Sequence, residues 1–286
     1  MVIGDRITQI TTYSGSARMG RVICISNQKG GVGKTTTAVN LSACIALAEK
    51  RTLLIDIDPQ ANASSGLGIR LPGSKPSAYQ LLLGTHSWSE LITSTDIDHL
   101  ELIPATQELI GAEVELIDLP SRESLLQKAI SSLTDCYDYV FIDCPPSLGM
   151  LTLNALVAAH SVLIPIQCEY YALEGVGSLL NTIDRVASVF NPDLTIEGFL
   201  LTMFDPRTNL SQQVAQDVQQ NLGPRVFKTI IPRNVKLSES PSFGKPVVLY
   251  DITSRGALSY FALAKEIIDA EQSTDTAEKI CIGAGS

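Results

Sequence analysis

The stretch Arg21-Val-Ile-Cys-Ile-Ser-Asn-Gln-Lys-Gly-Gly-Val-Gly-Lys-Thr-Thr36 joins an apolar, strand-like run to a glycine-rich turn, and a helix-forming segment follows at residues 38–48. A strand, such a turn and a helix N-terminus together form a phosphate cradle, because backbone N–H groups converge there and the helix dipole favours an anion. In loops of this kind the lysine reaches the β- and γ-phosphates and the following hydroxyl ligates Mg²⁺. Lys34 and Thr35 occupy those two positions. The stretch therefore predicts a nucleotide site at the end of the first strand.

A second lysine departs from the ordinary phosphate-loop pattern, G-x-x-x-x-G-K-[ST]. The first glycine of that pattern would fall at Gln28, and Lys29 follows it. A lysine ahead of the glycines cannot easily curl back onto the phosphates of its own loop, but in a symmetric dimer it could reach the nucleotide of the other subunit. A cation supplied in trans stabilises charge on the transferring phosphoryl group. The alternative is that Lys29 is a solvated loop residue.

The octapeptide at residues 29–36, K-G-G-V-G-K-T-T, resembles the deviant Walker A signature of the ParA/MinD superfamily of dimerising ATPases. Further matches resemble the second-strand motif, the Walker B and switch II motifs, and two segments typical of the ParA/Soj partitioning branch; they lie at residues 53–60, 143–147, 167–175 and 231–239. The resemblance covers about residues 20–270. It implies an α/β fold, namely a single-domain P-loop NTPase with a mostly parallel sheet covered by helices on both faces.

Composition and patterning agree with one domain. The 286 residues are 45% apolar, enough for a large core, and no apolar run approaches the roughly 18 residues of a membrane span. Strand-like and helix-like segments alternate, with a late strand expected at residues 226–231 and a closing helix at 255–270. We expect residues 1–20 to be a disordered extension, residues 21–271 to form the ATPase domain, and residues 272–286 to be a disordered tail. Residues 61–76, rich in glycine and serine, are expected to form a loop.

Three carboxylates, Asp56, Asp58 and Asp143, each end an apolar strand, where a charge is costly to place. Capping of a following helix is one interpretation of such aspartates. Their position near a phosphate loop favours handling of metal and water instead. The resemblance implies that Asp143 holds Mg²⁺ through water with Thr35 as a direct ligand, that Asp58 orients the attacking water, and that Asp56 supports the Mg²⁺ shell or the loop.

The resemblance also implies which residues contact the nucleotide, with ATP and Mg²⁺ as cofactors and Lys29, Lys34 and Asp58 as the catalytic residues. Near the base, Pro232 and Asn234 could favour adenine, although an ordinary turn is the alternative for this pair. The full expected contact set is Lys29, Gly30, Gly31, Val32, Gly33, Lys34, Thr35, Thr36, Pro232 and Asn234.

The distribution of charge bears on DNA. The formal net charge is −9, yet residues 205–265 carry eight basic and four acidic side chains. Arg207, Arg233 and Lys236 match positions that contact DNA in the partitioning branch, although solvated surface charge competes for each. Phosphate contacts of this kind would be independent of DNA sequence.

The resemblance implies a homodimer formed on ATP binding, nonspecific DNA as a ligand, a ParB-like partner that stimulates hydrolysis, and a cytoplasmic location on the nucleoid. A MinD-like positioning ATPase that acts on membranes is the alternative, disfavoured because residues 274–286 supply one lysine and two isoleucines. A metabolic or metal-delivery enzyme is a third class, disfavoured because the six cysteines form no C-x-x-C pair. The cargo is not identified by the sequence.

Overall fold

The computed structural model describes residues 20–71, 75–170, 172 and 174–283. Seven strands form one sheet in the order β3-β4-β2-β5-β1-β6-β7. All neighbouring strands are parallel except β3, which pairs antiparallel with β4 at the edge. In chain order the strands are β1 Arg21–Ile25, β2 Thr52–Asp56, β3 Thr93–Ser94, β4 Leu100–Ile103, β5 Tyr139–Asp143, β6 Ser161–Gln167 and β7 Thr195–Thr202.

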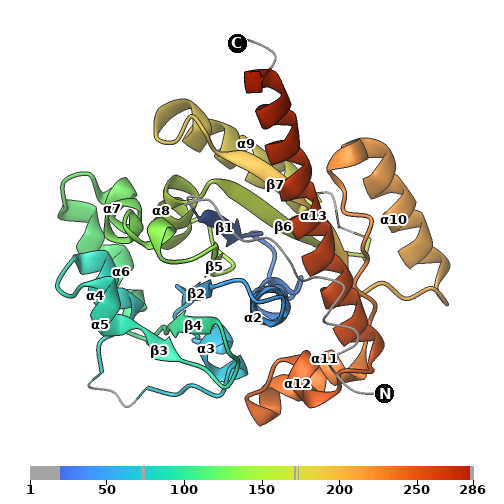
Figure 1. Ribbon diagram of the computed structural model, residues 1–286, viewed down its shortest axis with the longest axis horizontal. Coiled ribbons are helices and arrows are strands. Elements are labelled where there is room, and N and C mark those ends of the chain that lie inside the picture. Colours follow the sequence, from blue (N-terminus) through green and yellow to red (C-terminus); the bar gives the residue numbers. More distant parts are fainter. Residues whose placement is uncertain (1–19, 72–74, 171, 173, 284–286) are drawn as a thin grey trace.

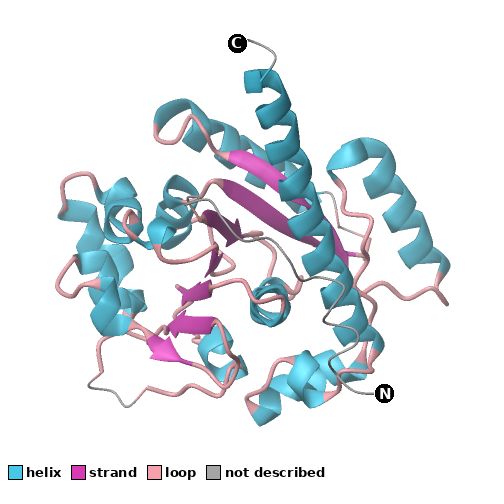
Figure 2. Cartoon of the chain, in the orientation of Figure 1, coloured by secondary structure: helices cyan, strands magenta, loops and turns pink. Residues whose placement is uncertain are grey.

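Helices cover both faces of the sheet (Figures 1 and 2). On one face, α2 and α13 pack in an apolar layer that includes Leu41, Ile45 and Leu263. The opposite face is covered by α4, α6, α7, α8, α9 and α10. This two-sided burial explains why β2 and β5 are buried at every residue. The helices are α2 Lys34–Leu47, α3 Asn62–Gly66, α4 Ala78–Leu83, α5 Trp88–Leu91, α6 Leu109–Glu115, α7 Leu125–Ile130, α8 Met150–Ala158, α9 Glu174–Val189, α10 Asn209–Leu222, α11 Val235–Glu239, α12 Val247–Tyr250 and α13 Arg255–Gly283.

The register of the central strands places the functional segments together. Ile25 at the end of β1 lies opposite Asp143 of β5, and Asp143 lies opposite Asp56 of β2. Because parallel strands end at the same edge, the glycine-rich turn and two carboxylates meet there. The expected fold class, a P-loop NTPase with a mostly parallel sheet between helical layers, is confirmed.

Residues 226–231 do not form the expected strand. They contact β7 through an isolated bridge between Val226 and Phe199 and through the amides of Phe227 and Ile231, which donate to β7 carbonyls at 3.0 and 2.9 Å. In between, the amides of Lys228 and Thr229 donate to the Glu266 carboxylate of α13, at 2.7 and 3.0 Å. The Glu266 side chain therefore accepts hydrogen bonds from two backbone amides that a continuous strand would use to pair with β7.

Two further expectations need correction. Within residues 61–76, expected to be a loop, Asn62–Gly66 forms α3. The closing helix does not end near residue 270: α13 runs to Gly283, so residues 272–283 are helical where disorder was expected. Residues 257–282 contain no proline or glycine, and helix-forming residues such as alanine, glutamate and lysine recur among them. The expected extension at residues 1–19 and residues 284–286 lie outside the described residues. Among the helices that are described, none is both long and apolar enough to cross a membrane.

Candidate functional site

The glycine-rich turn is shaped by two glycines in the left-handed region. Gly31 has φ +75° and Gly33 has φ +90°, conformations that side-chain-bearing residues rarely adopt. Gly33 is the N-cap of α2, and its carbonyl accepts from the Thr37 amide at 2.9 Å. The turn therefore delivers its backbone amides to the N-terminus of a 14-residue helix. This is the geometry of a phosphate cradle.

Two side chains that the sequence did not single out hold this turn in place. Asn27 accepts from the Lys29 amide at 3.0 Å and donates to the Pro165 carbonyl of β6 at 2.8 Å. The Thr202 hydroxyl at the end of β7 donates to the Val32 carbonyl at 2.8 Å. Neither residue belongs to a local motif, so only the sheet order reveals their role.

The two lysines of the turn have different surroundings. Lys34 is 6% exposed, and its Nζ donates to the Lys29 carbonyl at 3.1 Å. Burial lowers the pKa of Lys34, and the nearby Asp143 carboxylate partly opposes that effect. Lys29 is half-buried as a residue, and within the described residues no carboxylate pairs with its ammonium. The same loop thus holds one lysine bonded to the backbone and one lysine without a carboxylate partner in the described part of the chain.

Asp143 has the surroundings of a metal-associated carboxylate. The residue is fully buried, and neither carboxylate oxygen has a hydrogen-bond partner in the described part of the chain. Burial raises the pKa of Asp143 well above its usual value, and the Asp56 charge adds to this, while the Thr35 hydroxyl opposes it. Two orphaned buried oxygens beside a hydroxyl are costly unless a cation or its water shell satisfies them. Asp143 and Thr35 therefore fit Mg²⁺.

Asp56 supports the loop that follows β2. One oxygen accepts from the Asp58 amide at 3.1 Å, and the other accepts from the amide and hydroxyl of Ser64 at 2.8 and 2.7 Å. Ser64 also accepts from the Ala105 amide at 3.1 Å. Burial raises the pKa of Asp56 to about 6, and the bonds from Ser64 oppose the rise. Both oxygens thus accept hydrogen bonds from the segment that carries Asp58.

A cavity of about 340 Å³ opens beside the glycine-rich turn. It brings Pro232 and Asn234 next to Gly33 and Thr36, although these pairs are about 200 residues apart in sequence. The Asn234 oxygen accepts from the Lys236 amide at 3.0 Å and caps α11, so its amide NH₂ is the group left to meet a ligand. The lining residues are Gly33, Thr36, Thr202, Met203, Ile231, Pro232, Arg233, Asn234, Leu237, Ser238, Pro241 and Tyr260.

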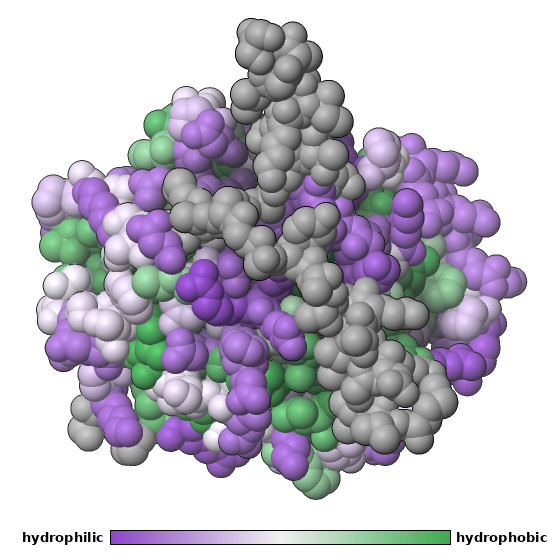
Figure 3. Space-filling model, viewed as in Figure 1, coloured by the Kyte–Doolittle hydropathy of each residue, from purple (hydrophilic) through white to green (hydrophobic). Residues whose placement is uncertain are grey.

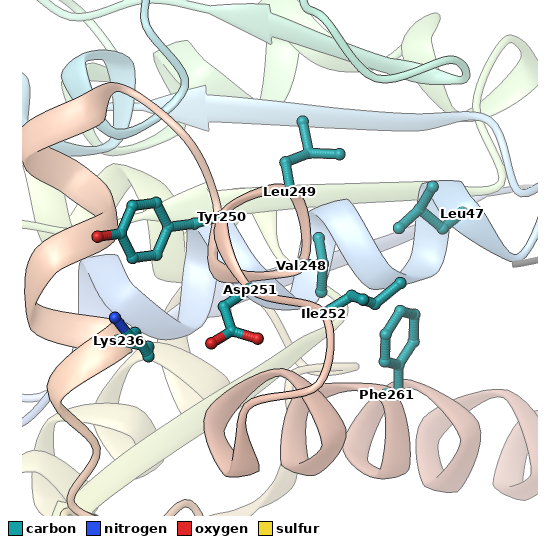
Figure 4. A pocket seen from close by; sticks show the side chains of 8 residues that line it. All are labelled: Leu47, Lys236, Val248, Leu249, Tyr250, Asp251, Ile252 and Phe261. Carbon is teal, nitrogen blue, oxygen red and sulfur yellow. The ribbon is translucent and has the colours of Figure 1, made fainter.

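The structure separates the three residues that were expected to contact DNA into two groups. Arg207 is 84% exposed and forms an ion pair with Asp205 at 2.7 Å. Arg233 pairs with Glu169 at 3.4 Å, and its charge also acts on Asp205. Lys236 instead lines a groove of about 690 Å³ over α12 and α13, where its Nζ pairs with Glu239 at 3.0 Å and lies 5.3 Å from the centre of the Tyr250 ring (Figure 4). Each of the three cations therefore has a carboxylate partner, which sequence counting could not reveal.

A family model described as an AAA domain matches residues 20–196. The chromosome partitioning protein ParA of Myxococcus xanthus is 57% identical over 254 residues, which cover 89% of this chain and 90% of that protein. The sporulation initiation inhibitor protein Soj of Bacillus subtilis is 55% identical over 249 residues, covering 87% of this chain and 98% of that protein. The chain belongs to the ParA/Soj family.

Solved structures agree with this ParA/Soj assignment at the level of the fold. A cobyrinic acid a,c-diamide synthase from Mycobacterium smegmatis with bound ADP and magnesium has a TM-score of 0.79 and 39% identity, covering 90% of this chain and 97% of that chain. The cell division ATPase MinD of Pyrococcus furiosus has a TM-score of 0.73 and 27% identity, covering 88% and 100%. This ParA/Soj protein is an ATP hydrolase whose cofactors are ATP and Mg²⁺.

Proposed function

We propose that this ParA/Soj protein dimerises on binding ATP, binds DNA without sequence preference as that dimer, and acts in chromosome or plasmid partitioning. Lys29 is the observation that carries the proposal. Its ammonium lacks a carboxylate partner among the described residues, whereas its own carbonyl is held by Lys34. A cation fixed at the backbone and unpaired at its tip is suited to reach a nucleotide held by a second copy.

The residues of the site have distinct roles in this proposal. The amides of residues 29–36 and Lys34 bind the phosphates, and Thr35 with Asp143 holds hydrated Mg²⁺, which neutralises charge on the phosphates when bound. Asp58, positioned by Asp56 and Ser64, orients the attacking water. Lys29 of the other subunit stabilises charge on the transferred group. Pro232 and the Asn234 amide bind adenine in the cavity beside Gly33. Turnover is slow until all these groups are assembled.

Names of relatives support the partitioning role over a positioning role at a membrane. The relatives at 57 and 55% identity are called ParA and Soj, while the MinD structure is 27% identical. By that likeness we propose a ParB-like partner that stimulates hydrolysis and a cytoplasmic, nucleoid-associated location. Arg207, Arg233 and Lys236 are the proposed DNA contacts, made when DNA phosphates compete with Asp205, Glu169 and Glu239.

Light scattering with the Asp58→Ala variant tests the proposal. Without the residue that orients water, bound ATP should remain unhydrolysed. The ATP-bound dimer should therefore persist, with twice the 30.7 kDa mass of the chain. The trapped dimer should retain random-sequence DNA in a gel-shift assay, and the nucleotide-free protein should not. A variant that stays monomeric with ATP and Mg²⁺ would refute the assigned role of Asp58 and the proposed dimer.

A further inference from the structure

A short helix at the carboxyl edge of the sheet carries an apolar stripe on its exposed side. On α6 and the 3₁₀ turn η1 (Leu116–Asp118) that continues it, Ile110, Val114 and Ile117 are 60, 69 and 51% exposed. Spacings of four and three residues place these side chains on one side of a helix. The opposite side packs into the core. Figure 3 shows apolar surface among polar atoms at the left flank, where Figure 1 places α6 and α7.

Carboxylates surround this stripe. Glu108, Glu113, Glu115 and Asp118 lie within the same eleven residues, which contain no lysine or arginine. Among the described residues none of the four is in an ion pair. Glu115 and Glu108 accept from neutral donors, the Tyr79 hydroxyl and the Gln80 amide, at 2.6 and 3.1 Å. We call the stripe and its four carboxylates the α6 face.

Arg122, just beyond the α6 face, does not neutralise it. Its guanidinium donates to the Ile117 carbonyl at 2.6 Å and pairs with Glu123 at 3.1 Å. The α6 face therefore combines apolar contact area with uncompensated negative charge. Isolated exposed apolar side chains are ordinary, but a periodic row with a charged rim is typical of an interaction surface.

We propose that the α6 face docks a basic, amphipathic segment of the partner that stimulates ATP hydrolysis; this rests on the proposed function. Charge complementarity selects the occupant, because lysine or arginine side chains would meet the exposed carboxylates of this face while apolar side chains cover Ile110 and Val114. A second copy of this chain is disfavoured, since a two-fold contact would set one acidic rim against another. DNA is disfavoured for the same electrostatic reason.

The α6 face contacts the segments that carry Asp143 and Asp58. The Glu113 side chain lies against Gly149, the N-cap of α8, and a Cβ added at Gly149 would overlap that carboxylate. Gly149 ends the segment that follows Asp143. At its other end α6 follows Ala105, whose amide donates to Ser64 and so joins the network that holds Asp58. A partner bound at α6 thus presses on the segments that carry Asp143 and Asp58.

Steady-state ATP hydrolysis tests the surface, with the purified ParB-like protein of the same organism as probe, in the presence of DNA. Val114→Ser combined with Asp118→Lys removes apolar area and reverses one charge, at two exposed positions. We expect the intrinsic rate to be unchanged and the stimulated rate to fall about tenfold or more. Val189→Ser, at a residue on α9 that is also 69% exposed, should behave like the unaltered protein. Full stimulation of the double variant would overturn the proposal.

Photo-crosslinking from position 114 identifies the occupant. With p-benzoylphenylalanine in place of Val114, we expect a product that joins this chain to the partner, and none from the same group at position 189. A product that joins two copies of this chain would overturn the proposal and assign the face to the dimer. If the partner cross-links at position 114 but does not stimulate the unaltered protein, docking stands and the proposed function fails. Stimulation without a cross-link leaves the proposed function standing and refutes docking at α6.

Discussion

The two lysines of the phosphate loop should differ in what their removal does. Lys34→Ala deletes a buried ammonium that also braces the loop through the Lys29 carbonyl, so ATP binding should be lost. Lys29→Ala keeps that carbonyl, so most ATP affinity should remain while hydrolysis falls, on the order of 10³-fold if it acts as a finger in trans. Titration calorimetry and phosphate release measure the two effects. Equal loss of ATP affinity in both variants would contradict a role for Lys29 across the interface.

Ser64 offers a second residue-level test, because its hydroxyl joins Asp56 to the Ala105 amide. Ser64→Ala should leave one Asp56 oxygen with a single donor and free the loop that carries Asp58. We expect kcat to fall about tenfold while the Kd for ATP changes little, since the phosphate cradle is untouched. Ser65→Ala is the matched control, because within the described part of the chain the Ser65 hydroxyl makes no hydrogen bond, whereas the Ser64 hydroxyl does. A rise in Kd without a change in kcat would assign Ser64 to nucleotide binding instead.

Among single residues, the sequence predicted those proposed to contact nucleotide and metal better than those that hold them in position. The phosphate loop and the strand-ending Asp56, Asp58 and Asp143 could be found because each is tied to a local pattern: a glycine spacing, or a charge at the end of an apolar run. Asn27, Ser64 and Thr202 could not, because each bonds to a segment brought near only by the sheet order.

Among the elements, α3 and the 3₁₀ turn η5 (Ser240–Phe243) meet through a glycine pair. Gly244 has φ +62°, and a Cβ there would lie 2.7 Å from the Gly68 Cα. Gly244→Ala should therefore cost backbone strain plus a steric clash, about 2 kcal/mol or more, and should weaken ATP binding because Pro241 lines the adjoining cavity. Urea denaturation and nucleotide titration measure the two effects.

Gly84→Ala is the control for that prediction. Gly84 has φ +67° but open space around its Cα, so alanine there should cost only the strain of the left-handed conformation, about 1 kcal/mol. ATP affinity should not change. Similar losses of stability in the Gly84 and Gly244 variants would show that close packing of η5 on α3 contributes nothing.

Elements with a strong period or motif were predicted, and elements defined by distant partners were not. The central strands β1, β2, β5 and β6 follow from apolar runs of three or four residues. Residues 226–231 are also rich in apolar side chains, yet the Glu266 carboxylate of α13 accepts from the amides of Lys228 and Thr229. The short helix α6 has no capping residue or sequence motif from which it could be predicted. Its exposed apolar stripe could be recognised only once the structure showed which of its residues are buried.

For the whole molecule, we expect ATP to create the DNA-binding surface. A chain of net charge −9, whose three candidate cations are each paired with a carboxylate, should bind DNA weakly as a monomer. A dimer carries two copies of each of these cations. Its affinity for DNA should fall steeply as the salt concentration rises, with a log–log slope of about −0.9 per phosphate neutralised. Arg207→Ala or Lys236→Ala should weaken binding and flatten that slope while the ATP-dependent dimer persists.

Arg51→Ala is the control for the DNA prediction. Arg51 is also exposed and paired with an aspartate, Asp138, but it precedes β2 and so lies at the amino ends of the strands, whereas Arg207 follows the carboxyl end of β7. Its removal should leave DNA affinity and salt dependence unchanged. Tight binding without nucleotide, or strong preference for one DNA sequence, would contradict this account.

The order of strands in the sheet has a consequence for amide hydrogen exchange. The catalytic segments follow β2, β5 and β1, which are neighbours in the middle of the sheet, whereas Arg207 and Arg233 follow β7 at its edge. Central strands open only in global unfolding, while edge segments exchange through smaller local openings. The region beyond β7 can therefore open and reclose many times during the life of one bound ATP. Slow deuterium uptake at Ile23 and Phe141, together with fast uptake around residues 205–209, would support local opening of the region beyond β7.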